Sequence, residues 1–272
     1  MTEFSVLTSS QNPRLKAAQK LRDRRSRERQ QRIIIDGLRE IRAALSASVE
    51  IDELFCNEEW IEREEVASVC AAAQRAGGSI FALPAHLFEK IEYGSRGQGL
   101  VATAATPERP LHAFTPRERS GEHDFFAVVD RLEKPGNLGA ILRTADAAGA
   151  GGLIATDGAT DLFNPNAIRS SLGSVFQLPA AVAAADDVVE WLTARNTTIL
   201  AARVDAATPI SAVDLRRPVA IVLGSESAGL GDAWRRKCVT PVTLPMRGSV
   251  DSLNVSAAAA AMFYEVVRQR LT

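Results

Sequence analysis

Alternation of apolar runs with helical segments in the second half of the chain constrains the fold more than any other sequence feature. Strands are predicted at residues 125–130, 152–156, 198–204 and 218–224. Helices are predicted at 139–148, between the first two strands, and at 256–270, where alanine is abundant. Such alternation favours a parallel sheet covered by helices on both faces. We therefore predict an α/β domain over residues 125–272.

The first 105 residues predict a second, smaller α/β unit. A basic helix begins near Pro13 and leads into an apolar strand at 33–35. The further elements expected are a helix at 38–45, a strand at 51–56, an acidic helix at 58–75, and strands at 80–83 and 99–104. Prolines and charged residues are concentrated in 106–124, which predicts a linker. The expected organisation is therefore a domain at 1–105, a linker at 106–124 and a domain at 125–272.

Composition is that of an ordinary globular protein, with 46% hydrophobic and 24% charged residues. No apolar run approaches the ~20 residues of a membrane helix. The N-terminus lacks the basic and apolar segments of a secretory signal. Cys56, Cys70 and Cys238 show no CxxC spacing, and the three histidines fit no ligand motif. We therefore expect a cytoplasmic protein with no membrane association and no bound metal.

Positive charge is concentrated near the N-terminus although the net charge of the chain is −1. Residues 13–32 contain nine basic side chains and only two acidic ones. The basic side chains are Arg14, Lys16, Lys20, Arg22, Arg24, Arg25, Arg27, Arg29 and Arg32. One interpretation is a solvated helical face, and the other is a surface that contacts nucleic-acid phosphates.

The loop after the strand at 125–130 contains the first group of candidate functional residues. Ligands bind at the carboxyl ends of the strands in parallel α/β sheets. Gly136 and Gly139 have G-x-x-G spacing and not the G-x-G-x-x-G spacing of dinucleotide-binding turns, which disfavours a dehydrogenase. A tight turn would also explain the glycines. Asn137 and Arg143 are polar residues that a turn does not explain.

Two further loops place polar residues beside predicted strand ends. The sequence N-P-N-A-I-R-S-S-L-G occupies 164–173, where helix capping would also explain the polar residues. The sequence G-S-E-S-A-G at 224–229 is followed by L-P-M-R-G-S-V-D-S-L-N-V-S at 244–256. Glu226 comes directly after an apolar strand, and S-L-N at 252–254 opens the last helix, which is unusual for a simple surface.

In this order the loops resemble the motifs of the SpoU (TrmH-type) RNA 2′-O-ribose methyltransferases of the SPOUT superfamily. They match N-x-G-x-x-x-R at 137–143, R-x-S-x-G at 169–173, and G-x-E at 224–226 followed by S-L-N-V-S at 252–256. The last helix, with E-V-V-R-Q-R, is similar to the final helix of the family. More loosely, residues 10–37 resemble the ribosomal-protein-like substrate-binding domain that many members carry. Ser227 departs from the pattern, because the family usually has glycine after the glutamate.

The resemblance implies a trefoil-knotted parallel-sheet domain that binds S-adenosyl-L-methionine in a bend of the knot. The cofactor-binding residues implied are Gly224, Leu244, Met246 and Leu253. Glycine at 224 would let the backbone approach the cofactor, and the leucines would pack against its adenine. The knot itself is exceptional among folds and is expected here only through the family.

The catalytic residues that the resemblance implies are Arg143, Asn137, Glu226, Ser252 and Asn254. Two roles are open for Arg143, as the base for the 2′-hydroxyl or as a clamp on the adjoining phosphate. We favour the clamp because a guanidinium stays protonated in proteins. The other four residues would orient the ribose. Members of the family form homodimers in which the arginine of one subunit can lie near the cofactor of the other.

The substrate expected is RNA, and the additional N-terminal domain favours ribosomal RNA. One alternative is a transfer RNA 2′-O-methyltransferase, and another is a non-catalytic RNA-binding protein on the same scaffold. A serine hydrolase is disfavoured because S-E-S-A-G at 225–229 lacks the first glycine of G-x-S-x-G and no histidine follows residue 123.

Overall fold

The computed structural model describes residues 4–94, 98–118, 123–158 and 161–271. These form two compact units, each described here by itself. Unit 1 comprises Met1–Glu108 and Phe163–Gln177, and unit 2 comprises Arg109–Leu162 and Leu178–Thr272. Both chain ends, at 1–3 and 272, and part of the predicted linker, at 119–122, lie outside the described residues.

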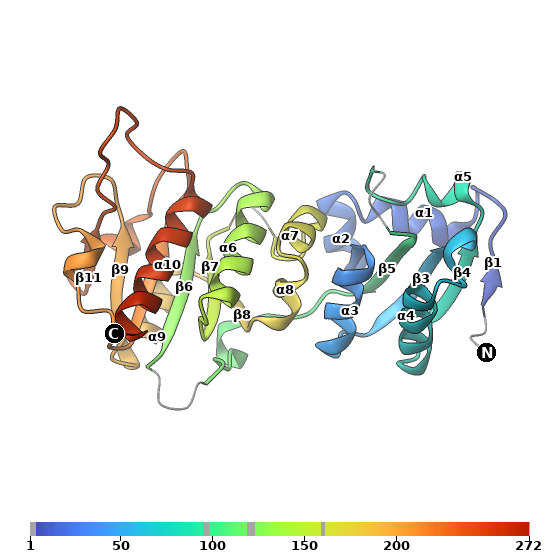
Figure 1. Ribbon diagram of the computed structural model, residues 1–272, viewed down its shortest axis with the longest axis horizontal. Coiled ribbons are helices and arrows are strands. Elements are labelled where there is room, and N and C mark those ends of the chain that lie inside the picture. Colours follow the sequence, from blue (N-terminus) through green and yellow to red (C-terminus); the bar gives the residue numbers. More distant parts are fainter. Residues whose placement is uncertain (1–3, 95–97, 119–122, 159–160, 272) are drawn as a thin grey trace. The chain divides into compact units, whose positions relative to one another are not determined.

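Unit 1 contains a five-stranded mixed sheet with strand order β1-β4-β3-β5-β2 (Figure 1). The strands are β1 (Ser5–Val6), β2 (Arg32–Asp36), β3 (Ile51–Asn57), β4 (Ser79–Leu83) and β5 (Leu100–Ala105). β4 pairs in parallel with β1 and β3, whereas β5 runs antiparallel to β2 and β3. Successive strand residues point to opposite faces, and most residues of β2, β3, β4 and β5 are buried, so both faces of these strands must be covered.

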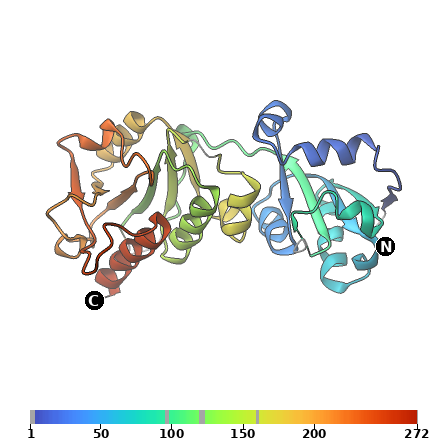
Figure 2. The same ribbon diagram turned by 90° about the horizontal axis from the view of Figure 1, so that it is seen from above.

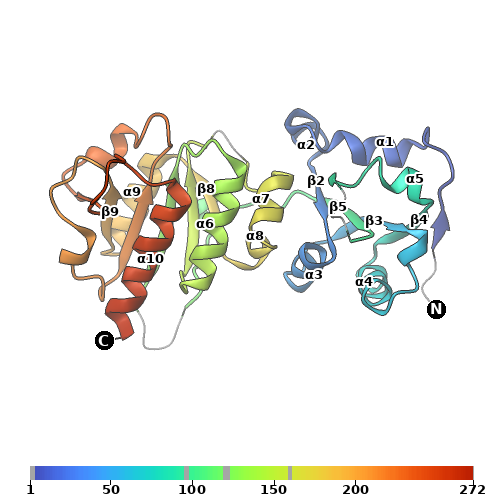
Figure 3. The ribbon, with the colours of Figure 1, turned by 45° about the horizontal axis from the view of Figure 1, so that its top comes forward.

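Helices cover both faces of this sheet (Figure 3). The helices are α1 (Pro13–Lys20), α2 (Arg24–Gln30), α3 (Leu38–Ser46), α4 (Glu64–Arg75) and α5 (Ala85–Phe88). Leu15 of α1 and Phe88 of α5 pack with Phe55 of β3 in one core. α3 and α4 lie on the other side of the sheet in Figure 3.

The segment Phe163–Gln177 belongs to unit 1 although it is distant from the rest of that unit in sequence. It contains α7 (Pro165–Ser170) and α8 (Ser174–Gln177). A Cβ on Gly173 would lie 2.5 Å from the Cβ of Ala43 in α3, so this packing requires glycine there. From the sequence, this segment was expected in the domain at 125–272, but it packs in unit 1 because α7 contacts β2 and α8 contacts α3.

Unit 2 is built on a six-stranded sheet with strand order β11-β9-β10-β6-β7-β8. The strands are β6 (Phe125–Asp130), β7 (Gly152–Thr156), β8 (Ala180–Ala183), β9 (Thr198–Ala202), β10 (Val219–Leu223) and β11 (Val239–Val242). Every pairing is parallel, as the alternation of strands and helices predicted. The carboxyl ends of all six strands therefore lie at one edge of the sheet.

Three helices cover the two faces of this sheet (Figure 2). α6 (Pro135–Ala147) and α10 (Val255–Leu271) lie side by side on one face, and α9 (Ala185–Ala194) lies on the other. Phe125 of β6 meets Phe263 of α10 edge to face, with 5.2 Å between the ring centroids. The α/β class predicted from the sequence is confirmed, and the trefoil knot stays a prediction. None of the described helices is long and apolar enough to cross a bilayer.

The basic run at 13–32 forms two helices and not one. Asp23 begins α2, because its carboxylate accepts the backbone N–H of Ser26 at 2.9 Å. Arg27 is only 4% exposed, and its Nη1 donates to the carbonyl of Leu21 at 2.9 Å. Several cations of the run are therefore structural, and contact with nucleic-acid phosphates stays a prediction for the exposed cations of the run. Its exposed cations are Arg14, Lys16, Lys20, Arg24, Arg25 and Arg29.

Candidate active site

A cavity of about 1080 Å³ opens where β9, β10 and β11 end, at the carboxyl edge of the unit 2 sheet. Its walls are the segments that leave these strands, together with the loop before α10 and the first turns of that helix. The lining segments are 202–205, 223–226, 228–230, 243–246 and 250–253, with Trp234, Arg235, Gly248, Val255, Ala258 and Met262. The position agrees with the general rule that ligands bind at the carboxyl ends of parallel strands.

All four residues expected to bind the cofactor line this cavity: Gly224, Leu244, Met246 and Leu253. The structure shows a second reason for glycine at 224, while the expected contact with the cofactor stays a prediction. A Cβ at this position would lie 2.6 Å from the backbone carbon of Gly229 and 2.8 Å from the backbone nitrogen of Leu230. The glycine is thus required by the fold of the loop itself, whose residues Ser225 and Gly229 exchange two backbone hydrogen bonds.

Three of the expected catalytic residues are joined by side-chain hydrogen bonds at the rim of the cavity. The amide of Asn137, in the first turn of α6, donates to Oε1 of Glu226. The amide of Asn254 reaches Oδ1 of Asn137 at 3.4 Å. Asn254 also accepts the backbone N–H of Ser256 at 2.9 Å and so begins α10. Each hydrogen bond joins residues at least 89 positions apart in sequence. Ser252, the fourth of these expected residues, lies in the cavity wall.

Arg143 does not line the cavity in the described structure. It is exposed on α6, and it has no hydrogen-bond or ion-pair partner within the described ranges. Six residues separate it from Asn137, which corresponds to about 9 Å along the helix and about 240° around it. The two side chains therefore leave α6 in different directions, and the guanidinium stays available for another molecule.

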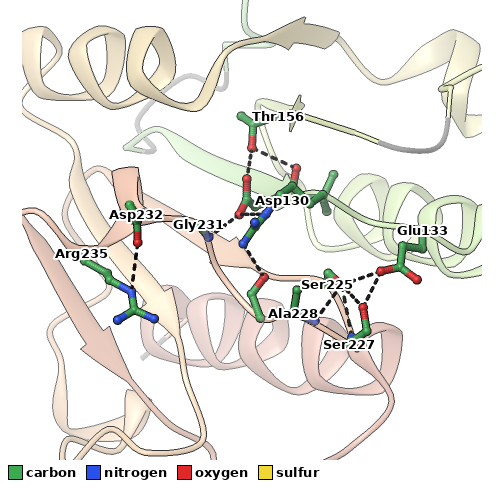
Figure 4. Close-up of polar contacts among 12 residues, drawn as sticks. Asp130, Glu133, Thr156, Ser225, Ser227, Ala228, Gly231, Asp232 and Arg235 are labelled. Atoms are coloured by element: carbon green, nitrogen blue, oxygen red, sulfur yellow. Dashed lines mark hydrogen bonds and ion pairs between the residues drawn. The ribbon is translucent and has the colours of Figure 1, made fainter.

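Asp130, at the end of β6, holds the loop from Gly224 to Gly231 (Figure 4). Its carboxylate is buried and accepts the backbone N–H of Gly231 at 2.8 Å and the hydroxyl of Thr156 at 2.8 Å. Arg131 has a positive φ of 51° and places Nε 3.4 Å from the same carboxylate. One buried carboxylate thus connects the ends of β6 and β7 to the wall of the cavity.

Glu133 forms a second attachment for the same loop (Figure 4). Its Oε1 accepts the hydroxyl of Ser225 at 3.1 Å and the hydroxyl of Ser227. Hydrogen bonds from Ser227 and then Ser225 lower the pKa of Glu133. Ser227, which departs from the family pattern, therefore has a partner in this chain. Glu133 was not predicted as a site residue, because its hydroxyl partners lie more than 90 positions away in sequence.

The cavity also contains charged residues that the sequence analysis missed. Arg203 and Asp205 follow β9, and the guanidinium donates to both carboxylate oxygens at 2.9 and 2.6 Å. The hydrogen bond between these two side chains lowers the pKa of Asp205 and raises the pKa of Arg203. Their position directly after a strand of the parallel sheet was the signal that could have identified them.

S-adenosylmethionine, the cofactor expected from the resemblance, fits this lining. Leu223, Leu244 and Leu253 offer apolar surface of the kind that packs against adenine. Glu226, whose hydrogen-bond partner is the neutral amide of Asn137, places a carboxylate where a cationic sulfonium or ammonium would be favourable. The volume lies slightly above the ~300–1,000 Å³ usual for ligand pockets, so the cavity is large enough for the cofactor. Within the described ranges, the structure has no group of three His, Cys, Asp or Glu residues that could hold a metal ion.

The fold and the cavity define an α/β protein that binds a ligand at the carboxyl edge of a parallel sheet. Comparison of the sequence with models of known protein families identifies the family within this class. The SpoU rRNA Methylase family model matches residues 124–264, and the MRM3-like substrate binding domain matches residues 12–102. The chain belongs to the SpoU rRNA methylase family.

Named relatives and solved structures agree with this assignment. A 23S rRNA (uridine(2479)-2′-O)-methyltransferase from Streptomyces viridochromogenes is 38% identical over 200 residues, which cover 67% of this chain and 65% of that protein. A crystal structure of an RNA 2′-O ribose methyltransferase, 38% identical, superposes with a TM-score of 0.83 over 98% of this chain and all of the other. An AdoMet-bound rRNA methyltransferase from Sinorhizobium meliloti, 28% identical, gives a TM-score of 0.86 over 99% of both chains.

Proposed function

We propose that this protein is an S-adenosylmethionine-dependent methyltransferase that methylates a ribose 2′-hydroxyl of ribosomal RNA. The observation that carries the proposal is the hydrogen-bonded group of Asn137, Glu226 and Asn254 at the rim of the cavity. Polar side chains from three distant segments meet where a substrate hydroxyl would approach a methyl donor bound in the cavity. Ribosomal RNA is favoured over transfer RNA because relatives that align with this chain are named 23S rRNA 2′-O-methyltransferases.

The protein contributes mainly alignment and electrostatics to such a reaction. The bound cofactor would supply an electrophilic methyl group for in-line displacement. Asn137, Glu226, Ser252 and Asn254 would orient the ribose. Arg143 would bind the adjoining phosphate through its planar fork of donors and stabilise the negative charge that develops on the 2′-oxygen.

The position of Arg143 supports a homodimer as the active form. Arg143 and Asn137 leave α6 in different directions, and Arg143 is not part of the cavity wall. In a dimer the arginine of one subunit would complete the site of its partner. The proposed setting is the cytoplasm, where ribosomal RNA is available.

Replacing Arg143 tests the proposal. Arg143→Ala is expected to lower the rate of methyl transfer at least about 100-fold, because one donor to a developing oxyanion is worth that much in other enzymes. Arg143→Lys is also expected to be slow, because an ammonium does not reproduce the planar fork. Transfer of labelled methyl groups to ribosomal RNA and to transfer RNA measures both the rate and the choice of substrate.

Controls separate the enzyme from a non-catalytic RNA-binding protein. Arg75→Ala, which removes an exposed arginine at the end of α4, should leave the rate unchanged. Calorimetry should give the Arg143 variants wild-type affinity for S-adenosylmethionine. Near-normal turnover in Arg143→Ala would contradict the assigned role. Absence of cofactor binding by the wild-type protein would contradict the proposed function as a whole.

A further inference from the structure

Tyr93, in unit 1, is an exposed aromatic residue that the active site does not account for. It follows α5 in the chain, and it is 45% exposed. Large aromatic side chains usually bury most of their surface, so an exposed tyrosine beside charged groups is a candidate contact for another molecule.

The backbone of Tyr93 is held on both sides. Its N–H donates to Oδ1 of Asp36 at 3.2 Å, and its carbonyl accepts Nη1 of Arg169 at 3.0 Å. Asp36 is itself 7% exposed at the end of β2. The ring is therefore presented from a backbone position fixed by two hydrogen bonds, which limits the entropy lost when a ligand binds.

Two guanidinium groups lie close to the ring. The Cζ atom of Arg22 is 5.6 Å from the ring centroid, and that of Arg169 is 5.5 Å away. Arg22 donates to both carboxylate oxygens of Asp36 and to the carbonyl of Ile91, so its position is fixed as well. The tyrosine ring and the guanidinium groups beside it are the two kinds of surface on which nucleobases stack.

Basic side chains outnumber acidic ones in α1 and α2, the two helices that flank Arg22 in the chain. The side-chain amide of Gln19 in α1 donates to the carbonyl of Lys90 at 3.2 Å, which places the segment before Tyr93 beside the end of α1. The exposed cations of that end and of the next helix include Lys20, Arg24, Arg25 and Arg29. Such a surface attracts a phosphate backbone and disfavours a basic protein partner.

We propose that Tyr93 is a stacking residue for an unpaired nucleobase of the substrate RNA, with Arg22 and Arg169 beside it and the exposed cations of α1 and α2 near the phosphates. Bases of a duplex are already stacked and paired, so only an unpaired base can use the ring. The inference rests on the proposed function, because it assigns a contact to the RNA of that reaction.

The experiment uses the full chain without cofactor and a short single-stranded RNA that contains 2-aminopurine. Stacking of this base on Tyr93 should quench its fluorescence. Tyr93→Leu should remove the quenching and weaken binding about 5- to 150-fold, the range for loss of one base–aromatic contact. Tyr93→Phe, the matched control, should keep both. The same RNA annealed to its complement should show no quenching by the wild-type protein.

Salt dependence distinguishes stacking from charge. Tyr93→Leu should leave the slope of log K against log salt unchanged, because no charge is removed. Arg25→Gln should lower that slope by about 0.7 and leave the quenching intact. Equal affinity and quenching for wild type and Tyr93→Leu would overturn the inference, even if methyl transfer to ribosomal RNA is observed. Quenching lost only in Tyr93→Leu would support it, whether or not the protein methylates the RNA tested.

Discussion

The carboxylate of Asp130 is expected to be one of the most sensitive positions in unit 2. It is fully buried, and it accepts a backbone N–H from Gly231 and a hydroxyl from Thr156. In Asp130→Asn the shape is retained. The new amide can face Thr156, whose hydroxyl can accept, but in either orientation the hydrogen bond between the Gly231 N–H and a full negative charge is lost.

The size of the effect follows from that one bond. A hydrogen bond to a charged group contributes about 1.5–3 kcal/mol. A loss of 1 kcal/mol lowers the Tm by about 2–4 °C in a domain of 150–250 residues. Asp130→Asn should therefore lower the Tm of unit 2 by about 3–12 °C. Because Gly231 ends the loop that lines the cavity, cofactor affinity should fall as well.

Thermal unfolding and hydrogen exchange test this expectation together. The amide of Gly231 should exchange faster in Asp130→Asn than in the wild type. Asp232→Asn, next to Gly231 in the chain, is the matched control. Asp232 is fully exposed and its ion pair with Arg235 is 3.7 Å long, so this change should have little effect on the Tm. Equal Tm values and equal exchange at Gly231 in all three proteins would refute the role given to Asp130.

Three other positions give independent tests. Gly224→Ala should weaken cofactor binding measured by calorimetry, because its Cβ would meet the backbone of Gly229, and unchanged binding would show that the loop adapts freely. Burial would raise the pKa of Glu53, but its hydrogen bonds with arginines lower the pKa overall. The stability that the ionised Glu53 gains from these hydrogen bonds is present above the unfolded pKa of about 4.3 and is lost as the pH falls below it. The free energy of unfolding in urea should therefore depend less on pH in that range for Glu53→Gln than for the wild type. Arg27→Gln should destabilise the protein by about 1–3 kcal/mol in urea unfolding, whereas the exposed Arg25→Gln should not, and equal stabilities would contradict the buried role of Arg27.

Strands were predicted best where apolar runs are buried on both faces. β6 and β7 begin and end at the residues predicted, because every residue in them is buried. β11 was missed because it is short, contains Pro241 and is half exposed at the edge of the sheet. α6 begins at Pro135 and not at Gly139, since a proline suits the first turn of a helix. The acidic helix begins at Glu64, after a 3₁₀ turn at Glu58–Trp60.

The candidate site was predicted through its motifs and not through its contacts. The sequence placed Asn137 and Glu226 in one site, and the structure joins them by a hydrogen bond. Their spacing in the chain could not show which loops touch. The partnership of Glu133 with Ser227 depends on the pairing of β6 with β10, which no local pattern encodes. The reason for glycine at 224 is likewise a clash with backbone that lies five residues further along.

The segment Phe163–Gln177 has a consequence for how this chain can be divided. The polypeptide enters unit 1, leaves it near Glu108, and returns at Phe163 before it completes unit 2. A cut at 106–124 would separate the chain into two pieces without separating the two units. The downstream piece would contain Gly173 but not Ala43, against which Gly173 packs. In the upstream piece, the surface around Ala43 would lose the segment that covers it. Exchange of substrate domains between relatives would therefore have to transfer two stretches of sequence together.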